Sequence, residues 1–253
     1  MWNMAISLLL FVGLCVAAPH PPSGRIIGGQ NASISDYPYA LQLEYHEGVH
    51  DLICGAVLIA PRWAITACHC LYNRDMEYFV RAGATDLGSG GTVYTVTNTV
   101  WHPNFRWHDD DYDAALLYLN DTVSDPDAAV IEMAPEGTPI PEGKNMTVVG
   151  WGYQDGNGNF PTVLQALEYP ILDNDTCTRR MTAISNYTES MFCAGYMEGG
   201  KGFCWADNGG PAVYDGILIG ISSWVNYCAT ADTPSGFTNI AFIRSWIDSV
   251  ISG

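Results

Sequence analysis

The segment Cys204-Trp205-Ala206-Asp207-Asn208-Gly209-Gly210-Pro211 organises the C-terminal half of this chain. Its Gly-Gly-Pro end is a strong turn signal, because glycine adopts backbone conformations that other residues avoid and proline cannot donate to a strand ladder. The apolar run Ala212–Tyr214 follows at once and has the composition of a short strand. The segment therefore predicts a tight turn that leads into a β-strand.

Similar β-branched and aromatic runs recur along the chain and are separated by Gly, Pro, Asn and Asp. They are Tyr39–Tyr45, Leu52–Leu58, Tyr78–Ala82, Thr92–Val100, Ala114–Leu119, Met146–Val149, Ala212–Tyr214 and Leu218–Trp224. Because the spacing is short and no helical segments alternate with the runs, we expect an antiparallel all-β barrel or sandwich. The one predicted helix is C-terminal, where Ile240, Ile243, Ile247 and Ile251 recur at about 3.6-residue spacing.

The N-terminal residues predict processing before folding. The apolar run Ala5–Ala18 ends in small residues and is too short to span a bilayer comfortably, so residues 1–17 are predicted to be a secretory signal peptide. Cleavage after Ala17 or after Ala18 fits equally, and a buried N-terminal helix is the alternative. Residues 18–25 form a Pro-rich extended linker ending at Arg25, and Ile26-Ile27-Gly28-Gly29 follows. This pattern predicts an activation propeptide that is cleaved after Arg25, which makes Ile26 the new N-terminus.

The charge balance excludes two classes of partner. The whole chain has a net charge of −17, and residues 1–25 contain one Arg and no acid, so residues 26–253 carry −17 − 1 = −18. Nucleic acid and anionic membrane surfaces are therefore not expected to bind. No segment after the predicted signal is long and apolar enough to span a membrane.

Cysteines and glycosylation sequons agree with a secreted, extracellular protein. Of eight Cys, Cys15 lies in the predicted signal, and the odd number that remains implies at least one Cys outside an internal disulfide. Five N-x-S/T sequons are candidate glycosylation sites, at Asn31, Asn120, Asn145, Asn174 and Asn186.

Three segments in a fixed order carry a family resemblance. They are Trp63-Ala64-Ile65-Thr66-Ala67-Cys68-His69-Cys70, Asp111-Tyr112-Asp113-Ala114-Ala115-Leu116-Leu117 and Cys204–Pro211. They resemble the catalytic-histidine, catalytic-aspartate and nucleophile segments of the chymotrypsin/trypsin-fold serine proteases (peptidase S1), and the order His, Asp, nucleophile is that of this fold. The resemblance covers residues 25–253. It implies two six-stranded antiparallel Greek-key β-barrels, roughly residues 26–138 and 139–253, with a C-terminal α-helix and an internal boundary near residues 133–144.

The resemblance assigns His69 as the general base and Asp113 as the acid that orients it. Asn208 stands where the family has its nucleophilic serine, and Ala206 stands where the family has an oxyanion-hole glycine. An amide nitrogen is resonance-delocalised and is not among the side chains that form acyl intermediates. We therefore expect a secreted, proteolytically inactive homologue that acts by binding. The alternative is an active endopeptidase of non-tryptic specificity, if Asn208 is a sequence error or is bypassed.

The segment that would bind a substrate side chain also departs from the family. Gly202 stands where trypsin-like members carry a basal Asp, so a preference for Lys or Arg is not expected. Three further positions, where the family has small residues or glycine, hold Phe203, Val225 and Ser235. These side chains are expected to fill the specificity pocket.

Other family features are retained. Asp207 matches the acid that pairs with the freed amine of Ile26, and a trypsin-like protease would supply the cleavage at Arg25. The resemblance implies the disulfides Cys54–Cys70, Cys177–Cys193 and Cys204–Cys228. Cys68 is then left over, as a small buried hydrophobe, as a mispairing partner of Cys54, or as an intermolecular link.

No cofactor and no metal are predicted. In the segment Gly83–Tyr94, where calcium-binding relatives gather carboxylates, Asp86 is the only acid. The run Asp109-Asp110-Asp111 is expected to be a solvated face, with a cation-binding rim as the alternative.

A narrower resemblance links the pattern of substitutions to the inactivated serine-protease paralogues of parasitic mites. It implies an extracellular protein partner and interference with host serine-protease cascades such as complement. A carrier of apolar ligands in the old cleft is a third possibility, and a filled cleft disfavours it.

Overall fold

The computed structural model describes residues 26–46, 50–73, 76–153, 158–181 and 186–253. The predicted signal peptide, propeptide and Arg25 lie outside the described residues. Within the described ranges, no helix is long and apolar enough to cross a membrane.

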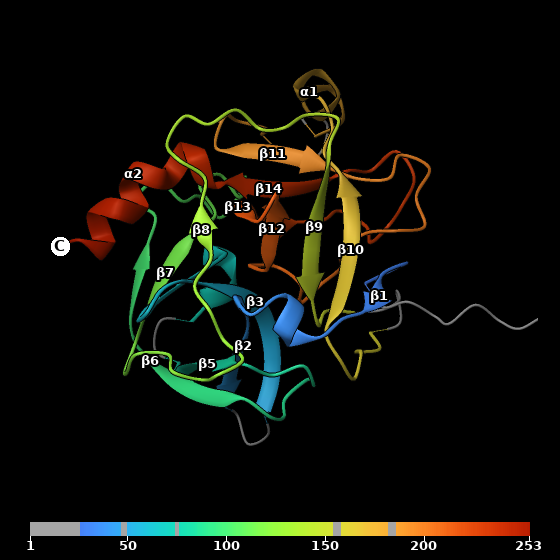
Figure 1. Ribbon diagram of the computed structural model, residues 1–253. Helices are drawn as coiled ribbons and strands as arrows, with labels where there is room; N and C mark the ends of the chain where they lie inside the picture. Colours follow the sequence, from blue (N-terminus) through green and yellow to red (C-terminus); the bar gives the residue numbers. More distant parts are fainter. Residues whose placement is uncertain (1–25, 47–49, 74–75, 154–157, 182–185) are drawn as a thin grey trace, which may run out of the picture.

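The first half of the chain forms a closed antiparallel barrel (Figure 1). Its six strands pair in the order β2-β3-β4-β7-β6-β5. The strands are β2 (Ala40–His46), β3 (His50–Ala60), β4 (Trp63–Thr66), β5 (Tyr78–Ala82), β6 (Thr92–Trp101) and β7 (Ala115–Leu119). Alternate residues of these strands point inward, so that Leu41, Leu43 and Val80 are fully buried in one core.

A second sheet has eight strands, six of them from the second half of the chain (residues 139–253), with the path β1-β10-β9-β12-β13-β14-β11, and β8 pairs with β13. The strands are β1 (Gln30–Asn31), β8 (Glu132–Met133), β9 (Asn145–Gly150), β10 (Gln165–Pro170), β11 (Met191–Ala194), β12 (Pro211–Tyr214), β13 (Ile217–Trp224) and β14 (Ser235–Asn239). An antiparallel bridge between Ile171 and Ala194 brings the far end of β10 to β11. The six strands β10, β9, β12, β13, β14 and β11 thus curl toward closure, and the predicted all-β, chymotrypsin-like fold is confirmed.

The C-terminal helix α2 (Ile240–Ile251) is also confirmed. The Asn239 side chain caps its N-terminus by accepting from the N–H of Phe242. Ile243 and Ile247 pack into an apolar cluster together with residues of both halves, among them Leu116 and Leu218. This cluster holds the two halves together.

A second helix, α1 (Asn174–Met181), was not predicted. Its sequence NDTCTRRM buries only Cys177 and Met181, one i,i+4 pair. A single pair over eight residues is too weak a periodic signal to mark a helix, and the Cys177–Cys193 disulfide ties this helix to β11.

Candidate active site between the two halves

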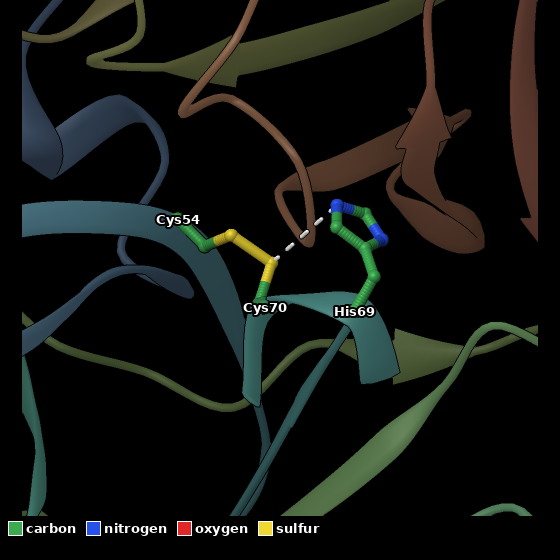
Figure 2. Close-up of side chains that lie close together, drawn as sticks. All are labelled: Cys54, His69 and Cys70. Carbon is green, nitrogen blue, oxygen red and sulfur yellow. Dashed lines mark hydrogen bonds between the residues drawn. A yellow bond between two sulfur atoms is a disulfide. The ribbon is translucent and has the colours of Figure 1, made fainter. Parts of the chain in front are cut away.

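His69 follows β4 in the chain and lies on the short 3-10 helix Cys68–Leu71. Cys70, its neighbour in the chain, forms a disulfide with Cys54 of β3, which fixes this turn against the barrel. Figure 2 shows the imidazole beside that disulfide, with Nε2 of His69 4.0 Å from Sγ of Cys70. The ring keeps 24% of its surface exposed, so one edge faces solvent.

Asp113, just before β7, is fully buried and holds His69 at two points. Its Oδ1 accepts from the backbone N–H of His69 at 3.0 Å, and its Oδ2 accepts from Nδ1 at 2.7 Å. Ser223 of β13 donates its hydroxyl to the same Oδ2 at 2.6 Å. These contacts place the proton of a neutral His69 on Nδ1 and leave Nε2 as an acceptor.

The environment of His69 favours its charged form. Burial would lower the pKa of the imidazole, but the charge and hydrogen bond of Asp113, with a further contribution from the charge of Asp110, raise it above its usual value.

Asn208 faces Nε2 of His69 from the other half of the molecule. Its Nδ2 lies 2.9 Å from Nε2, at donor distance. Its backbone carbonyl accepts from the N–H of Gly55 at 2.7 Å, which anchors the turn to the first barrel. The Oδ1 atom is buried and has no hydrogen-bond partner within the described part of the chain.

The buried serines near this point donate elsewhere. Ser222 donates to the carbonyl of Asp207, Ser223 to Asp113 and Ser190 to Asp111. Apart from the sulfur of Cys70, the side-chain group bonded to Nε2 within the described residues is the amide of Asn208.

The turn that carries Asn208 depends on two left-handed residues. Gly209 has φ +78°, and a Cβ there would collide with Thr66 and the carbonyl of Gly55. Ala206 has φ +70°, a conformation that costs a residue with a Cβ about 1–2 kcal/mol. The fold thus keeps a backbone shape suited to glycine at a position where the sequence has Ala.

Asp207, the residue before Asn208, is buried. Its Oδ1 accepts from the N–H of Gly152 at 2.7 Å and its Oδ2 from the N–H of Cys204 at 3.0 Å. Burial raises the pKa of this carboxyl to about 7, although both hydrogen bonds act to lower it. Ile26, whose amine is the expected partner, has its side chain fully buried in the core of the second half.

The predicted specificity-pocket residues gather in one aromatic cluster. Phe203 is 1% exposed, and its ring centroid lies 5.2 Å from that of Phe237 and 6.5 Å from that of Tyr169. The Tyr169 hydroxyl is hydrogen-bonded to Ser235 at 3.0 Å, and Val225 packs against the same cluster. Gly202 is also buried and forms a bridge with Ile27.

Tyr169 and Phe237 were not predicted for this cluster. Both are buried on strands, and in β10 the buried residues Gln165, Leu167 and Tyr169 alternate. That alternation was present in the sequence and was the available signal.

The acidic run before Asp113 is not a solvated face, so that prediction is wrong for Asp111. Asp111 is 2% exposed and accepts from Thr188 at 2.7 Å, Ser190 at 2.6 Å and Arg106 at 3.3 Å. Asp110 is half-buried, and its pKa is raised to about 6 by burial and by the charge of Asp113, against the lowering effect of His69.

One group of potential metal ligands includes this acid. Donor atoms of His69, Asp110 and Asp113 lie within 4.8 Å of one another. Asp113 and Nδ1 of His69 are bonded to each other, however, so this geometry serves to orient the ring. The absence of a metal stays a prediction.

The three predicted disulfides, Cys54–Cys70, Cys177–Cys193 and Cys204–Cys228, are all present. Cys68 is a buried thiol whose Sγ donates to the carbonyl of Ala114 at 2.9 Å, as expected for a small core residue. The five predicted glycosylation asparagines are all exposed, and their modification stays a prediction.

This fold and the linked His69–Asp113 pair define a member of the trypsin-like serine protease class. A family model described as Trypsin matches residues 26–247, and the chain belongs to that family. It is 34% identical to the vitellin-degrading protease of Bombyx mori over 100% of this chain and 96% of the relative. It is 34% identical to Trypsin 5G1 of Aedes aegypti over 90% of this chain and 85% of the relative. It is 32% identical to the anionic trypsin of Canis lupus familiaris over 97% of each.

Proposed function

We propose that this chain is a secreted serine-protease homologue that has lost proteolysis and acts by binding another extracellular protein. The observation that carries the proposal is the amide of Asn208 at 2.9 Å from Nε2 of His69. In the family's mechanism this imidazole takes a proton from a hydroxyl that attacks the substrate carbonyl. An amide nitrogen has no reactive lone pair to offer, so the base has no nucleophile to activate.

Two further features support the loss of turnover. Ala206 keeps its backbone N–H but places a Cβ at the oxyanion hole, where the family has glycine, and its left-handed φ of +70° costs about 1–2 kcal/mol. Phe203 is 1% exposed and packs on Phe237 and Tyr169, where a substrate side chain would otherwise enter. An intact oxyanion hole and binding site alone give about 10³–10⁴-fold acceleration over water, and here both are altered.

One observation favours a second candidate, an active endopeptidase of non-tryptic specificity. The hydrogen bonds from His69 and Ser223 to Asp113 are complete, at 2.7 and 2.6 Å, and the named relatives include trypsins and a protease. A working base and its orienting acid are thus present. This candidate requires some group other than the Asn208 amide to attack the substrate.

A direct test uses the protein cleaved after Arg25, with broad peptide-substrate mixtures and a serine-directed phosphonate. We expect neither covalent labelling nor steady turnover. The His69→Ala variant is the matched control, because contaminating protease would act equally in both preparations. Turnover that disappears in His69→Ala would establish the active endopeptidase and overturn the proposal. In this proposal, the bound protein belongs to a host serine-protease cascade such as complement.

A further inference from the structure

A concave site lies on the first barrel, away from the aromatic cluster that holds Phe203. It is formed where β6 ends at Trp101 and the chain runs through Phe105 and Trp107 toward Asp113. The cavity has a volume of about 410 Å³, and its lining includes Trp101, Pro103, Phe105 and Trp107. We call it the tryptophan pocket.

Three aromatic rings frame the tryptophan pocket at steep mutual angles. The centroids of Trp101 and Phe105 lie 5.9 Å apart with an interplanar angle of 75°. Trp107 lies 5.6 Å from Trp101 at 61° and 5.2 Å from Phe105 at 66°. Trp101 and Phe105 are anchored against the barrel core, whereas Trp107 is 50% exposed. Because Trp107 is half exposed, part of its indole remains accessible to an incoming group, and the faces of indole rings attract cations.

The charged residues next to the tryptophan pocket indicate the charge of its ligand. The segment 104–111 contains Arg106 against Asp109, Asp110 and Asp111, so its formal charge is +1 − 3 = −2. Arg106 is held by its own loop, with nitrogen–oxygen distances of 4.0 Å to Asp109 and 3.3 Å to Asp111. With the remaining acidity of the chain, this segment favours a cation and disfavours an anion.

The histidine of the pocket wall does not oppose a cation. His102 is buried, stacks on Tyr112 at 4.6 Å and accepts at Nδ1 from the N–H of Asn104. Burial lowers its pKa to about 4, against the raising effect of Asp111, so the ring is neutral at physiological pH.

We propose that the tryptophan pocket docks an arginine or lysine side chain presented by an extended segment of a partner protein. The guanidinium or ammonium group lies against Trp107, and the acids of the loop supply the longer-range attraction. A partner with a basic, protruding segment therefore fits this surface, whereas an acidic protein or an anionic membrane does not. The site is independent of the loss of proteolysis, because none of its rings belongs to the His69–Asp113–Asn208 group.

The test uses two Gly/Ser peptides that differ in one residue, arginine in one and its neutral isostere citrulline in the other. The indole N–H signals of the ¹⁵N-labelled mature protein are followed by NMR during titration. We expect the arginine peptide to shift the Trp101 and Trp107 signals saturably, and the citrulline peptide to bind at least tenfold more weakly. Raising the salt concentration should weaken the binding of the arginine peptide and leave the binding of the citrulline peptide unchanged.

Trp107→Ala should lower the affinity for the arginine peptide about tenfold, and Asp109→Asn should lower it by a smaller factor. Trp205→Ala is the matched control, because Trp205 is 47% exposed but lies next to the Asn208 turn. Equal binding of the two peptides would show a merely apolar site, and absence of binding or an unchanged Trp107→Ala affinity would equally overturn the proposal. None of these outcomes depends on whether the protein cuts peptides, so this proposal and the proposed function fail separately.

Discussion

Asn208 and His69 form a hydrogen bond across the boundary between the two halves, with Nδ2 2.9 Å from Nε2. A neutral imidazole accepts this bond from the amide, whereas an imidazolium would need an oxygen in its place. The side chain of Asn208 offers both atoms, and its Oδ1 is the one that now lies buried within the described residues without a partner. The identity of residue 208 therefore bears directly on the titration of His69.

Replacing Asn208 with Asp should raise the pKa of His69 above its already raised value. A carboxylate at hydrogen-bond distance from Nε2 stabilises the imidazolium, as Asp113 does at Nδ1. The measurement is an NMR titration of the His69 Cε1–H signal. Asp113→Asn should shift the pKa in the opposite direction, and an unchanged value in Asn208→Asp would show that the two side chains do not touch in solution.

The raised pKa of His69 also makes stability depend on pH. Because the folded value lies above the unfolded value of about 6.5, the folded state binds the proton more tightly. The resulting stabilisation is fully present below about pH 6.5 and is lost as pH rises through the folded pKa. Urea unfolding on either side of that range, compared with His69→Gln, measures this contribution.

Restoring the reactive residues alone should recover little proteolysis. In the double variant Asn208→Ser with Ala206→Gly, Phe203 still occupies the cluster with Tyr169 and Phe237. We expect kcat/KM on ordinary peptides to rise at least tenfold further when Phe203→Ser and Val225→Gly are added. The reason is that a small change in the space available to a substrate side chain changes kcat/KM by roughly 10–200-fold. Efficient cleavage by the double variant would contradict the role given to Phe203.

Asp207 should make cleavage after Arg25 stabilising. In the uncleaved chain the folded pKa of about 7 exceeds the unfolded value, so stability falls as pH rises from about 4 to about 7. The freed amine of Ile26 would pair with the ionised Asp207 carboxylate and so reverse this loss of stability. Asp207→Asn should therefore cost the cleaved protein about 3–5 kcal/mol and cost the uncleaved protein little at pH 8. Urea unfolding of the four samples decides the matter, and equal effects in both forms would rule out the ion pair.

Replacement of Asp111 and of Asp109 should have very different effects on stability, although the two residues are only two positions apart. Asp111 is 2% exposed and accepts from Thr188, Ser190 and Arg106, so Asp111→Ala takes the acceptor away from the buried Ser190 hydroxyl and from two more exposed donors. We expect a loss of about 2–4 kcal/mol in the free energy of unfolding. Asp109→Ala removes a carboxylate that lies 4.0 Å from the exposed Arg106, and the loss should stay within about 0.5 kcal/mol. Similar losses of stability for the two variants would contradict this prediction and would indicate that Asp111 behaves as a solvated surface residue.

The sequence was sufficient for the parts of the site that lie within continuous motifs. His69, Asp113 and Asn208 each sit in a segment whose pattern predicts its role, and the structure brings the three together. The bonds that Thr188 and Ser190 make to Asp111 join residues 77 and 79 positions apart, which no local pattern encodes. Composition alone therefore predicts that residues 109–111 are exposed. The burial of Asp111 depends instead on its tertiary partners Thr188 and Ser190.

The hydrogen bonds Asn208–His69–Asp113–Ser223 form one continuous chain that crosses between the two halves of the molecule twice. His69 and Asp113 belong to the first barrel, and Asn208 and Ser223 belong to the second sheet. Sliding or opening one half against the other must break bonds at both ends of this chain together. If the protein does not hydrolyse peptides, as we propose, the same side chains still act as a mechanical joint between the two halves, a role that does not depend on turnover.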